Sequence, residues 1–235
     1  MVVKVEIWSD VVCPWCYLGK RRFESALERF EHKADVDVRW RSFELDPAAP
    51  AVREGDPVQR LADKYGMSRA QAQAKNEQLT MLAATEGLEY HLDQVRSGNT
   101  FDAHRVLHLA ADNGVQDAVK ERFMRAYFTE REPVGDHETL TRLAVEAGLD
   151  DTAVREVLAS DRYAVDVRGD EEQAAAYGIS GVPFFVVDER YGVSGAQSAD
   201  VLLATLQRAW AEANPLTMVV DGDADESCEG DSCAV

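Results

Sequence analysis

Two stretches near the start of the chain arrange apolar residues as β-strands do. Residues 2–9, VVKVEIWS, place Val3, Val5 and Ile7 on one face of an extended backbone. Residues 36–43, VDVRWRSF, alternate apolar and polar side chains, which is typical of a half-buried strand. Between these stretches, apolar positions recur at helical spacing. The beginning of the chain therefore predicts a strand, a helix and a second strand.

The stretch from residue 57 to residue 163 has a different pattern, dominated by Ala, Leu, Glu, Arg and Gln. It contains no strand candidate, and Gly and Pro residues divide it into about four to six helical stretches. A helical block of this length between strand-forming segments is typical of an inserted domain. We therefore predict an inserted, all-helical domain over residues 57–163.

The following segment returns to mixed patterning. Residues 164–177 predict a helix, and the apolar stretches 184–188 and 191–194 predict two strands joined by a turn. A last helix is predicted over residues 198–214, because Pro215 cannot continue it. The predicted order is therefore β-α-β, then helices, then α-β-β-α.

This order predicts an α/β domain in two pieces, residues 1–56 and 164–215, which carries the helical insertion. Residues 216–235 form an acidic tail whose composition predicts mobility.

Charge and hydropathy narrow the classes of function. The chain has 43 acidic and 25 basic residues, a net charge of −18, so we expect no nucleic-acid partner. No stretch is long and apolar enough for a membrane span, so no membrane partner is expected. The first residues, MVVKVEIWSD, lack the features of a secretory signal, and we expect a cytoplasmic location.

The four cysteines form two close pairs, Cys13 with Cys16 and Cys228 with Cys233. Two pairs at opposite ends of a long chain favour redox or metal chemistry over a structural disulfide framework. A zinc site would need ligands from both pairs, and the C-x4-C spacing of the second pair is unusual for zinc. The sequence therefore favours redox chemistry and predicts no metal.

Cys13-Pro14-Trp15-Cys16 falls where the first strand gives way to a helix. Unpaired N–H groups and the helix dipole stabilise a thiolate at a helix start, and Pro14 fits the first helical position. We therefore predict Cys13 as the exposed, attacking thiolate and Cys16 as the cysteine that resolves a mixed disulfide. Trp15, between them, is expected to tune the reduction potential.

Two segments together carry a resemblance to a known family. The stretches SDVVCPWCYLGKRRFE and YGISGVPFFVVDERYGVSGAQ resemble DsbA-like thioredoxin-fold oxidoreductases, and more narrowly the cytoplasmic FrnE-type branch. That branch is similar to the 2-hydroxychromene-2-carboxylate isomerases and the kappa-class glutathione transferases. The resemblance covers about residues 3–213 and implies a thioredoxin fold with a helical domain inserted after its β-α-β half.

The resemblance also implies how substrates are positioned. In this family the Val182–Pro183 bond is cis, which sets Val182 beside Cys13 and leaves its backbone free to pair with an extended substrate chain. Pro14, Trp15, Val182 and Pro183 are therefore the candidate substrate-positioning residues. The implied partners are proteins that carry thiols or disulfides. No metal or organic cofactor is required, and glutathione is a candidate reductant.

The second cysteine pair lies in the acidic tail. Some FrnE-type proteins carry a C-terminal C-x4-C pair, so the resemblance extends weakly to Cys228 and Cys233. One interpretation is an accessory dithiol that exchanges with Cys13 and Cys16 as an internal substrate or regulator. The other is a self-closed or incidental pair. Nearby carboxylates oppose thiolate formation at both cysteines.

The stretch SGNTFDAHRVLHLA, residues 97–110, predicts a helix start with Asn99 as its N-cap. His104 and His108 have a metal-compatible spacing but no evident third ligand. Asn99, His104 and Arg105 match a pattern of the family's helical domain, so they either line a cleft or pack within the domain. Two further histidines, His91 and His137, have no identifiable partner and are predicted at the surface.

The predicted function is a thiol–disulfide oxidoreductase or isomerase that acts on protein disulfides. The alternative is a glutathione-dependent isomerase or transferase of the 2-hydroxychromene-2-carboxylate isomerase type. Those enzymes typically have a serine where this chain has Cys13, and the second cysteine here favours redox chemistry. A third interpretation adds binding of unfolded chains. No nucleotide-binding or serine-hydrolase motif occurs.

Overall fold

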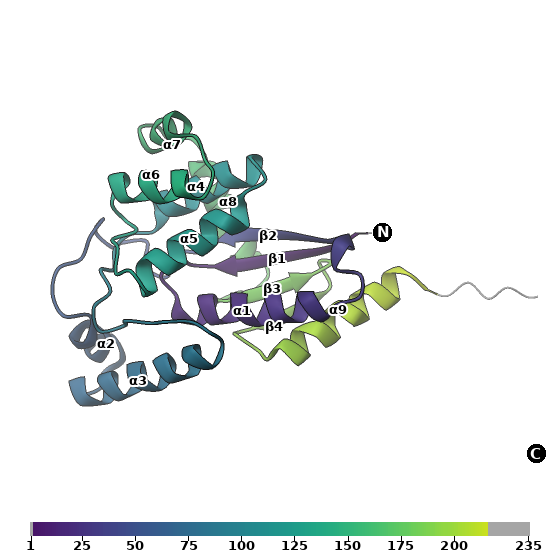
Figure 1. Cartoon of the computed structure of the whole chain (residues 1–235), viewed down its shortest axis with the longest axis horizontal. Helices are drawn as coiled ribbons and strands as arrows, with labels where there is room; N and C mark the ends of the chain where they lie inside the picture. Colours follow the sequence, from purple (N-terminus) through teal and green to yellow (C-terminus); the bar gives the residue numbers. More distant parts are fainter. Residues whose placement is uncertain (1, 216–235) are drawn as a thin grey trace, which may run out of the picture.

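The computed structural model describes residues 2–215 and has a four-stranded sheet at its centre (Figure 1). In the order β2-β1-β3-β4, the sheet joins strands β1 (Val3–Ser9), β2 (Val36–Ser42), β3 (Phe184–Val187) and β4 (Tyr191–Ser194). β1 and β2 are parallel, whereas β3 pairs antiparallel with both β1 and β4. The segments on either side of the helical stretch thus share one sheet, which confirms the predicted α/β class.

Helices cover both faces of this sheet. α1 (Pro14–Arg29) and α9 (Ala199–Ala213) pack together on one face, and α8 (Ala164–Ala176) lies on the other (Figure 1). A short 3₁₀ turn (Lys33–Asp35) joins α1 to β2. The β1 residues predicted to share a face all enter the hydrophobic cluster on the α1 and α9 side: Val3, Val5 and Ile7.

Six helices and no strand form between residues 57 and 163, all of which are described. They are α2 (Pro57–Tyr65), α3 (Arg69–Thr85), α4 (Phe101–Asp112), α5 (Gln116–Phe128), α6 (His137–Glu146) and α7 (Asp151–Leu158). The hydrophobic cluster among α4 to α7 also contains Cys13 and Cys16. The helical segment therefore packs directly on the first turn of α1.

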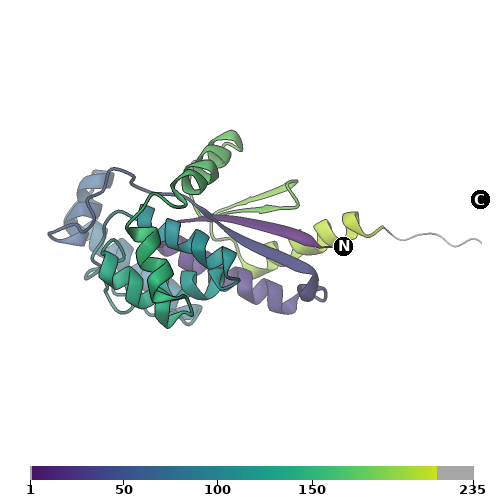
Figure 2. The same cartoon turned by 90° about the horizontal axis from the view of Figure 1, so that it is seen from above.

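α2 and α3 form a small hydrophobic cluster of their own, which includes Val58, Ala62 and Ala72. Both views place these two helices at the end of the molecule where α1 begins, opposite the start of β1 and the end of α9 (Figure 2). The thiol pair thus lies at the end of the sheet that faces α2.

Local backbone geometry sets element ends that the patterns predicted less closely. β3 ends at Val187 and not at residue 188, because Asp188 and Glu189 have positive φ angles of 50° and 55° and form the turn into β4. α9 begins after Ser198, whose side chain accepts a hydrogen bond from the backbone N–H of Val201. No helix within residues 2–215 is long and apolar enough to cross a membrane.

Candidate active site

The cysteine pair lies where β1 turns into α1. Cys13 is the N-cap residue of α1, with an extended backbone, and Pro14 follows at the first helical position. The backbone N–H groups of Cys16 and Tyr17 both donate to the Cys13 carbonyl, at 3.0 and 3.3 Å. Both thiols are free. The motif therefore has the strand–turn–helix setting that the sequence predicts.

The two thiols differ in their ease of ionisation. The hydrogen bond from Cys16 lowers the pKa of Cys13, and backbone N–H groups of the helix start lower it further, against the effect of burial. Burial raises the pKa of Cys16 well above its ordinary value, since its side chain is wholly enclosed. This asymmetry favours Cys13 as the attacking sulfur and Cys16 as the resolving one.

The prediction that Cys13 is exposed is wrong for this structure. Only 4% of Cys13 is exposed, because it belongs to the hydrophobic cluster against which Val12 and Val182 pack. Trp15 is instead the exposed residue of the motif, with 45% of its surface open. A substrate approaching the site therefore meets the indole of Trp15 before it meets sulfur.

The Val182–Pro183 segment lies directly against Cys13. The peptide bond is cis, and the Cys13 Sγ donates to the Val182 carbonyl oxygen at 3.6 Å. Gly19 of α1 allows this approach, since a Cβ there would lie 2.9 Å from Cγ of Pro183. A hollow of about 340 Å³ beside the thiols is lined by Trp15, Gly181, Val182, Pro183, Ser194, Gly195 and Ala196. Three of the four candidate positioning residues, Trp15, Val182 and Pro183, thus line this hollow, whereas Pro14 lines a separate groove.

Behind the thiols lies a group of buried polar residues, of which the sequence had pointed only to His104. Asp10 and His104 approach to 3.4 Å between Oδ1 and Nε2, although neither atom has a well-aligned hydrogen bond. Burial raises the pKa of Asp10, but His104 and the Leu45 N–H outweigh it, and the pKa lies below its ordinary value. Tyr90 donates its hydroxyl to the Pro14 carbonyl at 2.8 Å.

Lys120 of α5 completes this buried group. Its Nζ donates to the Ser9 carbonyl at 3.2 Å, where β1 ends. Burial lowers its pKa to about 8. Asp10 stands next to the cysteine motif in sequence and could have been noticed there. Nothing in the sequence pointed to Lys120, because it is far from the cysteine motif along the chain and only the fold places it near the end of β1.

The residues proposed to line a cleft divide between surface and interior. Asn99 lines a surface hollow of about 500 Å³ formed with the 49–52 loop and the start of α6, whereas His104 and Arg105 are buried. Arg105 donates to the carbonyls of Val157, Ser160 and Arg162 and pairs with Asp102, so it packs within the fold.

The predicted helix cap is also displaced by one residue. Thr100 is the N-cap of α4, and Asn99 accepts from the Phe101 N–H at 2.9 Å from one position earlier. Thr100 supplies no side-chain cap hydrogen bond of its own, so the Asn99 side chain takes that part for the first helical N–H.

The other histidines have partners that the sequence did not reveal. His108 lies 3.1 Å from both Asp170 and Ser42, and His91 and His137 contact Glu89 and Asp102 at 3.1 and 2.7 Å. Glu89 lies only two positions before His91, whereas the fold brings Asp102 beside His137. His137 is exposed, as predicted, and His91 is partly exposed. Within residues 2–215, no group of three or more His, Cys, Asp or Glu residues is placed to hold a metal ion. Cys228 and Cys233 lie outside the described residues.

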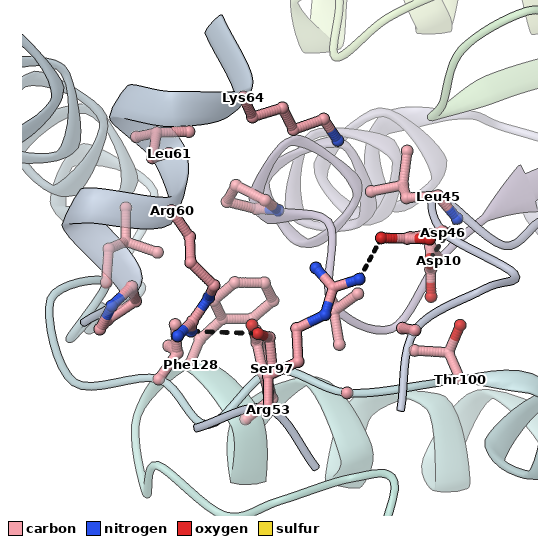
Figure 3. Close-up of a pocket in the computed structure, with 18 of the residues that line it drawn as sticks. Asp10, Leu45, Asp46, Arg53, Arg60, Leu61, Lys64, Ser97, Thr100 and Phe128 are labelled. Atoms are coloured by element: carbon pink, nitrogen blue, oxygen red, sulfur yellow. Dashed lines mark hydrogen bonds and ion pairs between the residues drawn. The ribbon is translucent and has the colours of Figure 1, made fainter. Parts of the chain in front are cut away.

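Another groove, of about 420 Å³, opens beside Pro14, between the start of α1 and α2 (Figure 3). Three cations line it. Arg53 pairs with Asp46, and Arg60 donates to Ser97 and to two backbone carbonyls. Three carboxylates, those of Asp10, Asp46 and Asp63, also line the groove, so it carries charges of both signs. Arg60 and Lys64 are its cations without an ion pair among the described residues.

Comparison with known proteins gives consistent matches. Residues 4–207 match the family model of the DSBA-like thioredoxin domain. The Bacillus subtilis protein YwbO, which is uncharacterised, is 31% identical over 208 residues, covering 86% of this chain and 94% of YwbO.

The solved structures that share the fold include the following two. A probable DsbA oxidoreductase from Streptomyces coelicolor has 48% identity and a TM-score of 0.86 over 99% of both chains. The cytosolic disulfide reductase DsbM from Pseudomonas aeruginosa, solved with GSH, has 16% identity and a TM-score of 0.63, covering 88% of this chain and 98% of that one. The second likeness extends to the fold alone.

Proposed function

The chain belongs to the family of DSBA-like thioredoxin domains, and from this premise we propose that it is a thiol–disulfide oxidoreductase acting on protein disulfides through Cys13 and Cys16. The observation that carries the proposal is the pair of free thiols whose pKa values move in opposite directions within one turn of α1. Such a pair separates an attacking sulfur from a resolving one.

The reaction follows from this asymmetry. The Cys13 thiolate attacks a substrate disulfide, forms a mixed disulfide and releases the first substrate sulfur as a thiolate. Cys16 then loses its proton and attacks Sγ of Cys13, so that the Cys13–Cys16 disulfide forms and the second substrate sulfur leaves. The substrate gains two electrons and the protein loses two. The oxidising direction runs through the same steps in reverse.

Substrate recognition is assigned to the hollow beside Trp15. The exposed indole offers an apolar surface to a polypeptide, and the Val182–Pro183 segment beside Cys13 offers backbone groups to an extended chain. The hollow is open at the surface and lined on both sides by backbone-rich segments, which suits a chain and not a compact molecule.

Insulin-disulfide reduction and reactivation of scrambled ribonuclease, run side by side, test the proposal. We expect activity in at least one assay, its loss in Cys13→Ser, and accumulation of a mixed disulfide in Cys16→Ser. A wild-type protein inactive in both assays, or a Cys13→Ser variant with full activity, would contradict the proposal.

Glutathione is the reductant that we assign to the cycle. Its carboxylates suit the groove beside Pro14, where Arg60 and Lys64 lack carboxylate partners among the described residues. Lys64→Ala should slow reduction of the oxidised protein by glutathione about twofold or more, but not reduction by uncharged dithiothreitol. Lys75→Ala, an exposed lysine of α3 outside the groove, is the matched control. Equal slowing with both reductants would contradict the assignment.

The glutathione-dependent isomerase remains the alternative function. It would need only one hydroxyl or thiol at the helix start, whereas this chain has two thiols that act on each other. Isomerisation of an aromatic pyruvate in the presence of glutathione, unchanged by Cys16→Ser, would favour this alternative over redox exchange.

We assign Cys228 and Cys233 a second role, as a dithiol that exchanges with Cys13 and Cys16. The support is their close spacing in sequence, which suits a disulfide that opens and closes. A double Cys228→Ser, Cys233→Ser variant should change the turnover or the reduction potential, and deletion of residues 216–235 should have the same effect. Unchanged kinetics in both variants would rule out the exchange.

A cytoplasmic location completes the proposal. Its support is the shared fold with a cytosolic disulfide reductase and the lack of a membrane-spanning helix within residues 2–215. Fractionation of cells that produce the full chain, with the thiols trapped by alkylation at lysis, tests it. Recovery of the protein outside the cytoplasmic fraction would contradict it.

A further inference from the structure

Lys120 is buried beside the thiol pair, and the exchange steps described above do not use it. Its side chain has no exposed surface, and its Nζ has one hydrogen bond, to the Ser9 carbonyl. Within residues 2–215 it forms no ion pair. Burying an ammonium group without a carboxylate partner is energetically unfavourable. An apolar residue would therefore be more favourable at this position if packing were its only role.

Lys20 provides a contrast within the same structure. It is almost as buried as Lys120, but its Nζ lies within 3.2 Å of carboxylate oxygens of Asp117 and Glu121 and also contacts Glu24. Those carboxylates hold the pKa of Lys20 above its ordinary value despite burial. The charge of Lys20 therefore serves an ion-pair network, whereas Lys120 has no such partner in the described part of the chain.

The groups that act on Lys120 come from three elements. Cys13, Cys16 and Lys20 belong to the α1 side, and Asp10 to the turn after β1. From β2, the Trp40 ring lies with its centroid 5.5 Å from Nζ. Burial lowers the pKa of Lys120 to about 8, while the negative forms of Cys16, Asp10 and Cys13 act in the opposite direction. Among these groups, a Cys16 thiolate is the charge that appears only during the reaction.

Cys16 needs such support because it must ionise without solvent. Its side chain has no exposed surface, and burial raises its pKa well above the ordinary value. The neighbouring Ser9 hydroxyl has no other hydrogen-bond partner and favours the thiolate, as does Lys120. A fixed positive charge in this enclosed place acts more strongly than it would in water.

We propose that Lys120 is a positioning residue for the second exchange step: its ammonium stabilises the Cys16 thiolate that resolves the mixed disulfide. The proposal rests on the proposed thiol–disulfide function. The thiol proton of Cys16 ends on the departing substrate thiolate, Cys16 bonds to Cys13, and the Cys13–substrate bond breaks. Run in reverse, the same ammonium stabilises Cys16 as the leaving group. The helical insertion thereby supplies a charge to the chemistry of the sheet domain.

A two-phase assay separates this step from the first. When reduced protein attacks 5,5′-dithiobis(2-nitrobenzoate), Cys13 releases one coloured thiolate and resolution by Cys16 releases a second. Serine replaces Cys228 and Cys233 in every protein, so that the phases report one thiol pair. The variants are Lys120→Gln, which can still donate to the Ser9 carbonyl, and Lys120→Met, which cannot. Arg125→Gln removes a charge from the exposed side of the same helix as the control.

Both Lys120 variants should slow the second phase about 10- to 100-fold at pH 7, with a smaller change in the first. The difference from wild type should shrink as pH rises through about 8, where Lys120 loses its charge. A slow phase in Lys120→Met alone would overturn the proposal in favour of a role for the Ser9 hydrogen bond. So would a pH-independent defect, or an equal defect in Arg125→Gln.

If neither variant folds, the wild-type protein still tests the proposal. The rate of its second phase should have an inflection near pH 8 that the first phase lacks, and identical pH profiles would overturn it. Failure of the proposed function is distinguishable from failure of this inference. If the protein is inactive in the insulin assay but its second phase still depends on Lys120, only the proposed function is contradicted. If the second phase is normal in both Lys120 variants, only the inference about Lys120 is contradicted.

Discussion

Cys13 and Cys16 lie one helical turn apart, yet their surroundings move their pKa values in opposite directions. Helix-start N–H groups favour a charged Cys13, and complete enclosure disfavours a charged Cys16. Each thiol also acts on the other, because the Cys16 thiol is the largest single cause that lowers the pKa of Cys13. The attacking sulfur therefore depends on the resolving one before any substrate arrives.

Replacing Cys16 by alanine should raise the pKa of Cys13, because the largest stabilising hydrogen bond to the thiolate is lost. Cys16→Ser, which keeps a hydroxyl donor, should raise it less. The pH dependence of Cys13 alkylation by iodoacetamide measures both shifts, with serine at Cys228 and Cys233. Equal midpoints in wild type and both variants would show that the helix start alone holds the pKa down.

At the scale of elements, α1 and the segment before β3 meet without space for a side chain at Gly19. A Cβ there would lie 2.9 Å from the Pro183 ring, which is not a flexible chain end. Gly19→Ala should therefore lower the free energy of unfolding by about 1–3 kcal/mol and slow exchange with substrates. Denaturant unfolding and the insulin assay measure the two effects.

Gly169 of α8 provides the matched control for that change. A Cβ at this exposed helical glycine would contact nothing within 4 Å, so Gly169→Ala should raise stability by about 0.5–1 kcal/mol. The two substitutions are chemically identical and differ only in what the new methyl group meets. If both had the same sign, close contact at Pro183 would not be the cause of the Gly19 effect.

Arg105 joins α4 to the connection between α7 and α8 through three main-chain carbonyls. Lysine has a single charged group and cannot reach all three, so Arg105→Lys should lower the free energy of unfolding by about 1–3 kcal/mol. Arg142→Lys, in a half-exposed pair network, should change it by less than about 1 kcal/mol. Urea unfolding of both variants checks this. Equal, small decreases in the free energy of unfolding would mean that water replaces Arg105 as the hydrogen-bond donor to the carbonyls.

The elements themselves were predictable because their signals are local. Period-two patterns identified β1 and β2, and the Gly and Pro breaks predicted about four to six helical stretches between residues 57 and 163, where six helices form. What the patterns missed depends on backbone geometry or distant contacts. The α4 cap moved from Asn99 to Thr100, and nothing in the sequence linked Arg105 to carbonyls more than 50 positions away.

At the scale of the whole molecule, the same distinction divides the candidate site. Cys13 and Cys16 could be predicted from a strand, a helix start and their spacing. The burial of Cys13 could not, because it depends on Val182, which is 169 positions away. Lys120 lies 111 positions from Ser9, to which it is bonded. The sequence thus predicts the reacting atoms, while the electrostatic environment around them is a property of the assembled fold.

Oxidation links this environment to the stability of the whole chain. The folded-state pKa of Cys13 lies below its ordinary value of 9.0, so between these two values the unfolded reduced chain binds more protons than the folded one. The free energy of unfolding of the reduced protein should therefore rise with pH in that window, by at most about 1.4 kcal/mol per pH unit. As pH falls through the folded-state pKa of Cys13, this contribution is lost.

The oxidised protein has no Cys13 thiol to titrate, so the difference between reduced and oxidised stability isolates the effect. As pH rises toward 9.0, we expect the free energy of unfolding of the reduced form to increase relative to that of the oxidised form. Above 9.0 the trend should reverse, because the raised pKa of Cys16 has the opposite effect on stability. Urea unfolding of both redox forms across this range measures it, with serine at Cys228 and Cys233. In the reduced Cys13→Ser variant, the free energy of unfolding should not rise with pH below 9.0. If the free energy of unfolding of that variant still rises with pH, another titrating group causes the pH dependence and the Cys13 thiolate is not the charge that the fold stabilises.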